Sequence, residues 1–326
     1  MTDNTISLNE INDLQTIADT VKQWLDKDKG WKERFAGYTQ EISVKEDEIT
    51  KVKSAFHKSP NLNLYTCIGD IISNKGFNLR YKGQSVAYLK EKNSVLTLLS
   101  NKNLDKNNKD YFGWTDSLNC AWDSPEATKF RKHFSGNVEK KGHVEHLYES
   151  MLIEEFAKKS SKDKELCNIQ PVRIYNQFAF QMTTTLSGSG KTIKMSQTAR
   201  AGGIDILARV KHGANTNLCV IELKKDALNS EQQAHIIRGQ GLGYAVFLRE
   251  LLRSESGQEW YKIFGYSGNI PDKLTIDVCI AAPVGKYGII KEPAYVSLGQ
   301  DMLRFKYLTF ETDNKNIKSI KTDLFD

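Results

Sequence analysis

Two short apolar segments decide the fold of this chain. Residues 202–207 read GGIDIL, and residues 218–225 read LCVIELKK. A polar stretch with one glycine separates them, so the two segments are expected to pair as a β-hairpin. Successive side chains of a strand point to opposite faces, so Glu222 and Lys224 share a face. The hairpin therefore predicts that Asp205 lies beside Glu222 and Lys224 at one edge of a sheet.

Two carboxylates that converge at a sheet edge suit a hard divalent cation. Mg²⁺ takes oxygen ligands, keeps several waters and commonly completes its shell with substrate phosphate. We expect Asp205 and Glu222 to hold Mg²⁺ or Mn²⁺. Lys224 would stabilise negative charge on the phosphate in the transition state or help to deprotonate the attacking water. The pattern predicts phosphodiester hydrolysis without a covalent intermediate.

Further motifs complete a pattern that resembles the PD-(D/E)xK nuclease superfamily, and more narrowly its RecB-like branch. Gln240 and Tyr244 stand one turn apart on one face of an expected helix. Upstream, residues 142–146 read GHVEH, which matches a Gly-x-x-x-His motif. The resemblance covers roughly residues 142–285.

The resemblance implies roles for these residues. Gln240 and Tyr244 would orient the lysine or the substrate phosphate. His146 would be a metal ligand, and Glu149, three residues further on the same helix face, is an alternative or additional ligand. The cysteine cluster that binds iron–sulfur in some RecB-like nucleases has no counterpart, because the five cysteines are scattered singly.

The expected fold class is α/β, a restriction-endonuclease-like mixed central sheet flanked by helices and preceded by a small α+β domain. At 326 residues the chain exceeds the usual size of a single core. We assign residues 1–120 to the N-terminal domain, which would recognise DNA or dock a partner. Residues 121–141 form a basic connector, and residues 142–326 form the nuclease domain.

Local patterns place several elements. A capping box at residues 7–10 predicts the start of an amphipathic helix. Apolar runs at 261–266, 275–280 and 303–310 predict strands of the nuclease domain. Three glycines within residues 239–243 are expected to be close-packing positions in the helix that carries Gln240, because each glycine weakens a helix by about 1 kcal/mol relative to alanine.

One segment imitates a phosphate-binding loop. Residues 186–192 read LSGSGKT, but threonine occupies the position of the first required glycine, and the segment lies between strand-like runs rather than before a helix. A β-hairpin is the favoured interpretation.

Composition narrows the choice of partners. The 46 Lys and Arg against 40 Asp and Glu give a formal charge of +6, which is compatible with a polyanionic partner such as DNA. No apolar stretch approaches the roughly 20 residues of a membrane span, and the polar N-terminus lacks a signal-peptide pattern. We expect a cytoplasmic protein without membrane contact that acts alone, as a homo-oligomer or with other defence or repair proteins.

The sequence thus predicts a Mg²⁺- or Mn²⁺-dependent deoxyribonuclease, in particular a restriction-like or phage-defence endonuclease. The alternatives are a RecB-like exonuclease of DNA repair, a nuclease that cuts RNA, and a nucleic-acid-binding assembly subunit that keeps the fold without cleaving. The retention of Asp205, Glu222 and Lys224 argues against the last alternative.

Overall fold

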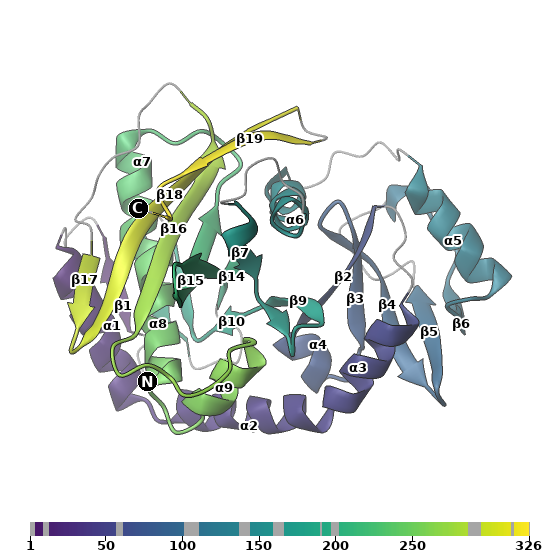
Figure 1. Cartoon of the computed structure of the whole chain (residues 1–326), viewed down its shortest axis with the longest axis horizontal. Helices are drawn as coiled ribbons and strands as arrows, with labels where there is room; N and C mark the ends of the chain where they lie inside the picture. The colour runs from purple at the N-terminus through teal and green to yellow at the C-terminus, as the bar shows by residue number, and fades with distance from the viewer. Residues whose placement is uncertain are drawn as a thin grey trace.

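The structure is a computed structural model in which two seven-stranded sheets lie side by side (Figure 1). It describes residues 4–8, 13–56, 61–100, 111–136, 144–158, 166–189, 191–196, 202–285, 295–313 and 316–325.

The central sheet is mixed, as the sequence predicts. Its strands are β7 (Ile169–Pro171), β14 (Ile206–His212), β15 (Asn215–Leu223), β16 (Thr275–Pro283), β17 (Tyr295–Leu298), β18 (Asp301–Thr312) and β19 (Ile317–Thr322). The order is β17-β18-β16-β15-β14-β7, and β19 also pairs with β18. Strand β16 is parallel to both β15 and β18, whereas the other neighbours are antiparallel. The predicted strands at 275–280 and 303–310 are confirmed.

Helices cover both faces of this sheet. On one face lies α6 (Val144–Phe156), whose Tyr148 ring packs edge-on against Phe310 of β18. On the other face lie α7 (Ser230–Ile236), the π-helical turn η3 (Ile237–Gly241) and α8 (Leu242–Leu252). The predicted architecture of a mixed sheet between helices is therefore confirmed.

The second sheet is built mainly from the N-terminal third of the chain. Its strands, in chain order, are β2 (Leu62–Cys67), β3 (Phe77–Tyr81), β4 (Gln84–Lys92), β5 (Val95–Ser100), β6 (Leu118–Ala121), β8 (Arg173–Ile174) and β9 (Phe178–Gln181). The spatial order is β6-β5-β4-β3-β2-β9-β8, with a parallel pairing between β2 and β9. A segment from the second half of the chain therefore completes the N-terminal sheet.

The remaining helices surround the two sheets. They are α1 (Leu14–Lys27), α2 (Gly30–Val44), α3 (Glu46–Ala55), α4 (Ile68–Ile72), α5 (Pro125–Ser135) and α9 (Gly257–Ile263), with 3₁₀ turns η1 (Tyr111–Gly113) and η2 (Leu166–Asn168). Among the described residues, no helix combines the length and the apolar character that crossing a membrane requires.

Small strands connect the N-terminus to the second half of the chain. They are β1 (Thr5–Ser7), β10 (Thr183–Thr184), β11 (Leu186–Gly188), β12 (Thr192–Met195) and β13 (Gly202–Gly203). Strands β11 and β12 pair as a hairpin, which confirms the interpretation of LSGSGKT. The predicted helix start at Ser7 is wrong, because Ser7 pairs with Thr192 in a sheet. The helix begins at Leu14, and the Asp13 side chain caps it.

Helices α1 and α2 pack on the central sheet's α8. The predicted amphipathic face of α1 is buried, and it comprises Leu14, Ile17, Ala18, Val21 and Leu25. In α2, the Trp31 and Phe35 rings lie 5.4 and 5.1 Å from the ring of Phe247 in α8. The first helices therefore share a core with the second half of the chain.

The prediction of a strand at 261–266 is wrong, because most of this segment belongs to α9 and the turn that follows it. Trp260, Ile263 and Phe264 recur at helical spacing and are buried. Trp260 lies 6.0 Å from Phe35 of α2, measured between ring centroids. A short aromatic run fits either a strand or a buried helix, so its periodicity alone could not decide.

The predicted domain boundary at residue 120 is crossed by two sets of contacts. Strand β1 pairs with β12, and β9 pairs with β2. One cluster of buried apolar residues also contains side chains from both halves of the chain. The division into a DNA-recognition domain and a nuclease domain stays a prediction.

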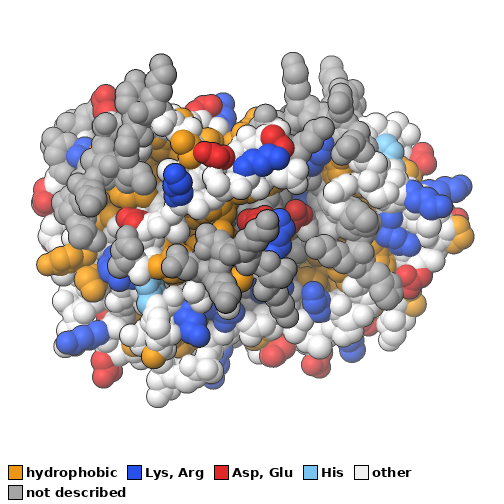
Figure 2. All heavy atoms as spheres, turned by 45° about the horizontal axis from the view of Figure 1, so that its top comes forward, with side chains coloured by type: hydrophobic (Ala, Val, Ile, Leu, Met, Phe, Trp, Pro, Cys, Tyr) orange, Lys and Arg blue, Asp and Glu red, His pale blue; other side chains and the backbone are white. Residues whose placement is uncertain are grey.

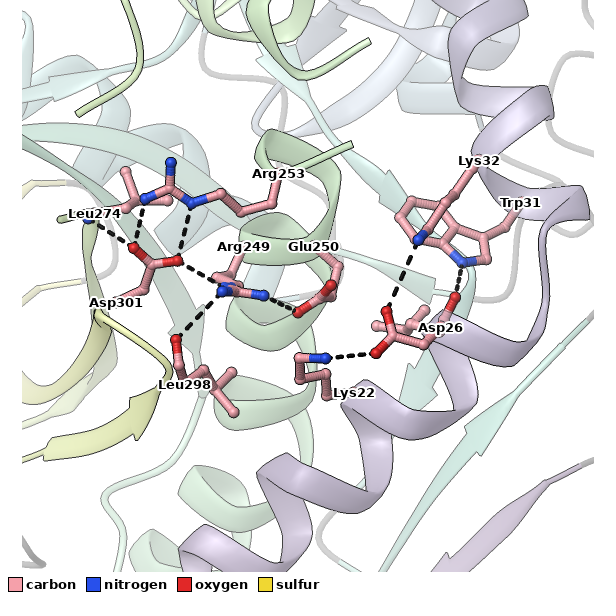
Figure 3. Close-up of polar contacts among 11 residues, drawn as sticks. Lys22, Asp26, Trp31, Lys32, Arg249, Glu250, Arg253, Leu274, Leu298 and Asp301 are labelled. Carbon is pink, nitrogen blue, oxygen red and sulfur yellow. Dashed lines mark hydrogen bonds and ion pairs between the residues drawn. The ribbon is translucent and has the colours of Figure 1, made fainter. Parts of the chain in front are cut away.

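A buried ion-pair network fastens α8 to the start of β18 (Figure 3). The Asp301 carboxylate accepts hydrogen bonds from Arg249 Nε at 2.8 Å, from Arg253 and from the Leu274 backbone N–H at 2.9 Å. Burial alone would raise the pKa of Asp301, but these hydrogen bonds hold it below its ordinary value. The network therefore stabilises the fold with Asp301 ionised.

We expect Asp301→Ala to lower the free energy of unfolding by about 3 kcal/mol at neutral pH, because two arginines would lose their buried partner. Urea denaturation measures this loss. The matched control is Asp313→Ala, which removes an exposed partner of Lys318 and should cost less than about 1 kcal/mol. An equal loss of unfolding free energy in the two variants would contradict a stabilising role of the buried network.

Candidate active site

The β14–β15 hairpin brings Asp205 beside Glu222, as the sequence predicts. Ile206 pairs with Ile221 in antiparallel register. Asp205 precedes Ile206 and Glu222 follows Ile221, so these two residues lie opposite each other. Cross-strand neighbours in such a pair lie about 5 Å apart at Cβ on the same face. The two carboxyl groups therefore leave the sheet together, on the face that carries η3 and α8.

A backbone hydrogen bond fixes Asp205 at the end of the hairpin. Leu223 N–H donates to Asp205 Oδ2 at 2.8 Å. The Leu223 side chain is buried on the opposite face, beneath α6. The residue between Glu222 and Lys224 thus anchors the strand and orients the aspartate.

Glu222 is fully buried, and the hydrogen-bonding capacity of its carboxyl group is unsatisfied. Neither Oε1 nor Oε2 has a hydrogen-bond partner among the described residues. Buried polar atoms without partners are rare in native structures and call for a specific explanation, such as an ion or a catalytic role. Glu222 is therefore the residue whose environment most needs an added cation.

Lys224 supplies one positive charge near this carboxyl pair. Its Nζ lies 3.9 Å from Glu222 Oε2 and 3.7 Å from Glu145 Oε1 on α6. The lysine side chain is partly exposed, whereas Glu222 is not. The predicted grouping of Asp205, Glu222 and Lys224 is present, and it remains accessible at the lysine end.

Burial perturbs the protonation of both carboxyl groups. It raises the pKa of Asp205 to about 6, although the Leu223 N–H and Lys224 oppose the change. Burial raises the pKa of Glu222 well above its ordinary value, and the neighbouring Asp205 raises it further. Two adjacent buried carboxylates resist ionising together. Without an added cation the pair retains a proton near neutral pH.

Asp205→Asn should stabilise the metal-free protein at about pH 8 by up to about 3 kcal/mol. The Asp205 pKa is 3.8 in its ordinary state and about 6 when folded, so the folded chain binds more protons between these values. Stability therefore falls as pH rises through this window, and the loss is complete above it. Asparagine keeps an oxygen that can accept the Leu223 N–H.

Thermal unfolding in a chelator, compared at about pH 5 and about pH 8, tests this expectation. The gain from Asp205→Asn should be about twice as large at the higher pH, because a pH of about 5 lies midway between the ordinary pKa of 3.8 and the folded pKa of about 6. Asp226→Asn removes the same charge from an exposed loop position and serves as the control. A gain of equal size in the control would show that overall charge, and not the carboxyl pair, sets the effect.

Gln240 and Tyr244 lie on the helical face above the carboxyl pair. Gln240 is in the π-helical turn η3, and Tyr244 is buried in α8. Burial raises the pKa of Tyr244, and the charges of Glu222 and Asp205 raise it further. The phenol therefore stays protonated. Its oxygen is the acceptor for Gly188 N–H at 3.4 Å.

The glycines around Gln240 permit close approach, as the sequence predicts for this segment. A Cβ on Gly239 would lie 2.1 Å from the Ser189 carbonyl oxygen, and one on Gly241 would lie 2.8 Å from Val278 Cγ1. Both positions exclude larger residues unless the backbone moves. π-Helical turns occur frequently at functional sites, where they adjust the position of one side chain.

His146 and Glu149 form a separate pair on α6. His146 Nδ1 lies 3.3 Å from Glu149 Oε2, and this hydrogen bond raises the pKa of His146. Glu149 is almost completely buried. The structure places both residues near Asp205, whose charge raises the pKa of His146 slightly further. Metal ligation by either residue stays a prediction, and Gly142 of the upstream motif lies outside the described residues.

Arg80 joins this pair from the other sheet, and sequence reasoning missed it. Arg80 Nη1 lies 3.5 Å from Glu149 Oε1, and Nη2 donates to Gln181 Oε1 at 2.8 Å. Its guanidinium lies over the Tyr65 ring, 4.6 Å from the centroid. No sequence motif identifies an arginine that reaches α6 from a distant meander.

Glu145 was also missed as a site residue. It lies four residues before Glu149, on the same side of α6, and faces Lys224. Its position within the GHVEH stretch was the available signal, since one turn of helix separates it from a predicted ligand.

The described residues contain no group of three or more His, Cys, Asp or Glu side chains arranged to hold a metal ion. The structure instead brings Asp205 and Glu222 together and keeps His146 with Glu149. Two carboxylates are nevertheless a common protein contribution to a Mg²⁺ site, because this ion keeps several waters. The orphaned oxygens of Glu222 fit such an ion.

Comparison with known proteins gives no family or function for this chain, because no family model, curated protein or solved structure matches it.

Proposed function

We propose that the chain is a metal-dependent nuclease that hydrolyses phosphodiester bonds in DNA. The observation that carries this proposal is the fully buried Glu222 carboxyl group, which lacks a hydrogen-bond partner in the described part of the chain and lies beside Asp205 and Lys224. A structural role would not favour two adjacent buried carboxyl groups, because they resist ionising together and burial raises the pKa of both. A site that binds a cation accounts for both.

Asp205 and Glu222 would hold the Mg²⁺ or Mn²⁺ ion. When bound, such an ion supplies Lewis-acid chemistry to the phosphate and to a water. The Leu223 N–H keeps Asp205 oriented through its 2.8 Å hydrogen bond. The rigid end of β15 therefore defines where a phosphodiester can bind.

Lys224 and Tyr244 supply the remaining polar groups. The Lys224 ammonium, at the accessible side of the pair, stabilises negative charge on the phosphate oxygens or helps to remove a proton from the water. The water oxygen forms a bond to phosphorus while the bond from phosphorus to the leaving oxygen breaks. Protonated Tyr244 and the neighbouring Gln240 orient the lysine or the phosphate.

The arrangement of the strands and helices supports a more specific fold assignment. A mixed sheet with helices on both faces and carboxyl groups at the ends of adjacent strands is what the restriction-endonuclease-like fold would require. We propose this fold for the second half of the chain. The restriction-like or phage-defence role rests on fold analogy.

Mn²⁺ should raise the melting temperature of the unmodified protein at about pH 8, because it binds only the folded chain. At a Mn²⁺ concentration 100 times Kd the expected gain is about 2.7 kcal/mol. Asp205→Asn and Glu222→Gln should each remove most of the gain, and Asp226→Asn should retain it. Equal shifts in all four proteins would place the metal elsewhere.

Lys224→Ala should lower the rate of DNA cleavage with Mg²⁺ or Mn²⁺ by about 100-fold or more, because it removes a group that acts on transition-state charge. Lys225→Ala is the matched control, since Lys225 is the exposed neighbour. Labelled supercoiled, linear and single-stranded DNA, together with RNA, would be the substrates.

The product pattern separates the nuclease alternatives. Internal cuts in supercoiled DNA indicate an endonuclease, whereas cleavage that needs a free end indicates an exonuclease. Absence of cleavage on every substrate, together with absence of a Mn²⁺ shift, would overturn the proposed function and favour an assembly subunit.

A further inference from the structure

A chain of hollows runs along the side of α6 away from the carboxyl pair. One hollow of about 500 Å³ lies between α6 and strands β2 and β9, and a second, of about 590 Å³, shares Ala157, Lys158 and Arg173 with it. A third, of about 510 Å³, shares Gln170 and Arg209 with the second. Neighbouring hollows share lining residues and therefore adjoin one another, and the three together are called the furrow.

The furrow is strongly basic. Its described lining contains five cationic side chains, Lys53, Lys158, Arg173, Arg209 and Lys273. The only carboxylate in that lining is Glu154, and it already accepts a hydrogen bond from Asn63. This excess of positive charge suits a polyanion.

Two central cations are available to a ligand. Arg173, on β8, makes no ion pair with any described residue, and it lines both of the first two hollows. The Lys158 side chain, two residues beyond the end of α6, is 60% exposed, and among the described residues it pairs with Glu155 alone. Exposed pairs of this kind contribute little, so a phosphate can replace Glu155 at small cost.

The furrow leads to the proposed active site. A narrow crevice lined by Glu149 and Asp205 shares Tyr65, Ile153 and Ala179 with the first hollow. Helix α6 connects both places: at 1.5 Å per residue, Phe156, which lines the second hollow, lies about 10 Å along the helix from Glu149. This length corresponds to a short stretch of an extended strand.

The face that Figure 2 presents, with the top of Figure 1 turned forward, shows acidic and basic side chains side by side near its middle. Basic side chains on such a face can contact a backbone of phosphates. The size of each hollow suits a ligand of one or two nucleotides. An extended single strand presents one nucleotide after another and therefore suits hollows of this size.

We propose that this furrow binds the sugar–phosphate backbone of a single DNA strand that extends from the scissile phosphate. Arg173 and Lys158 contact the phosphates nearest the site, and Arg209 contacts those further along. The inference rests on the proposed nuclease function, and it assigns a substrate form to that function: single-stranded DNA or a frayed end.

The test measures binding in the absence of cleavage. Fluorescence anisotropy of a labelled single-stranded oligonucleotide would compare Asp205→Asn with the same protein carrying Arg173→Glu and Lys158→Glu. The furrow variant should bind at least about 10-fold more weakly at low salt. The slope of log affinity against log salt should fall by about 0.7 for each lost phosphate contact.

The control carries Lys27→Glu and Lys29→Glu instead. These exposed lysines lie at the junction of α1 and α2, outside the furrow lining, and reversing them changes the net charge equally. If the reversed furrow variant does not fold, Arg173→Gln with Lys158→Gln removes the contacts without adding repulsion. The control should keep the affinity and the salt slope.

Several outcomes would overturn the proposal that the furrow binds single-stranded DNA. Unchanged affinity in the furrow variant, or an equal loss of affinity in the control, would overturn this binding proposal. Cleavage of DNA by the unmodified chain would still support the proposed function. Duplex DNA that competes as well as the single strand would overturn the assignment to single strands. An unmodified chain that neither binds nor cleaves DNA would overturn both the furrow and the function.

Discussion

The arrangement of the site depends on the hydrogen bond from the Leu223 backbone N–H to Asp205. Strand pairing alone places two acidic residues opposite one another, but their side chains could still turn apart to reduce repulsion. By accepting the N–H of the residue that follows Glu222, Asp205 is held against its partner. The packing of the core offsets the repulsion between the two close carboxyl groups. Leu223 is buried beneath α6, and the adjacent strands are buried on both faces.

Sequence patterns predicted the parts of the structure that depend on neighbours along the chain. The hairpin between residues 206 and 223 followed from alternation and a polar turn, and so did the grouping of Asp205, Glu222 and Lys224. The close-packing role of Gly239 and Gly241 followed from their cost in a helix. Contacts between distant segments had no such signal. Arg80 reaches Glu149 only because a meander from the first third of the chain packs against α6.

The errors have the same origin. Ser7 has the residue type of a helix cap, yet its backbone pairs with Thr192, and pairing across such a separation leaves no mark on local sequence. The aromatic run after Trp260 was equally consistent with a strand, and only its packing on Phe35 decides for a helix. Local rules thus sufficed for the acidic centre, whereas its surroundings are set by tertiary contacts.

The parallel pairing of β9 with β2 has a consequence for synthesis of the chain. More than a hundred residues separate the two strands, so β2 leaves the ribosome with one edge exposed and must wait for its neighbour. Exposed strand edges invite aggregation, and non-local pairing is slow. The N-terminal sheet and the strands of the acidic centre therefore mature together, late in translation. An unfinished chain would then have neither a complete N-terminal sheet nor a complete acidic centre.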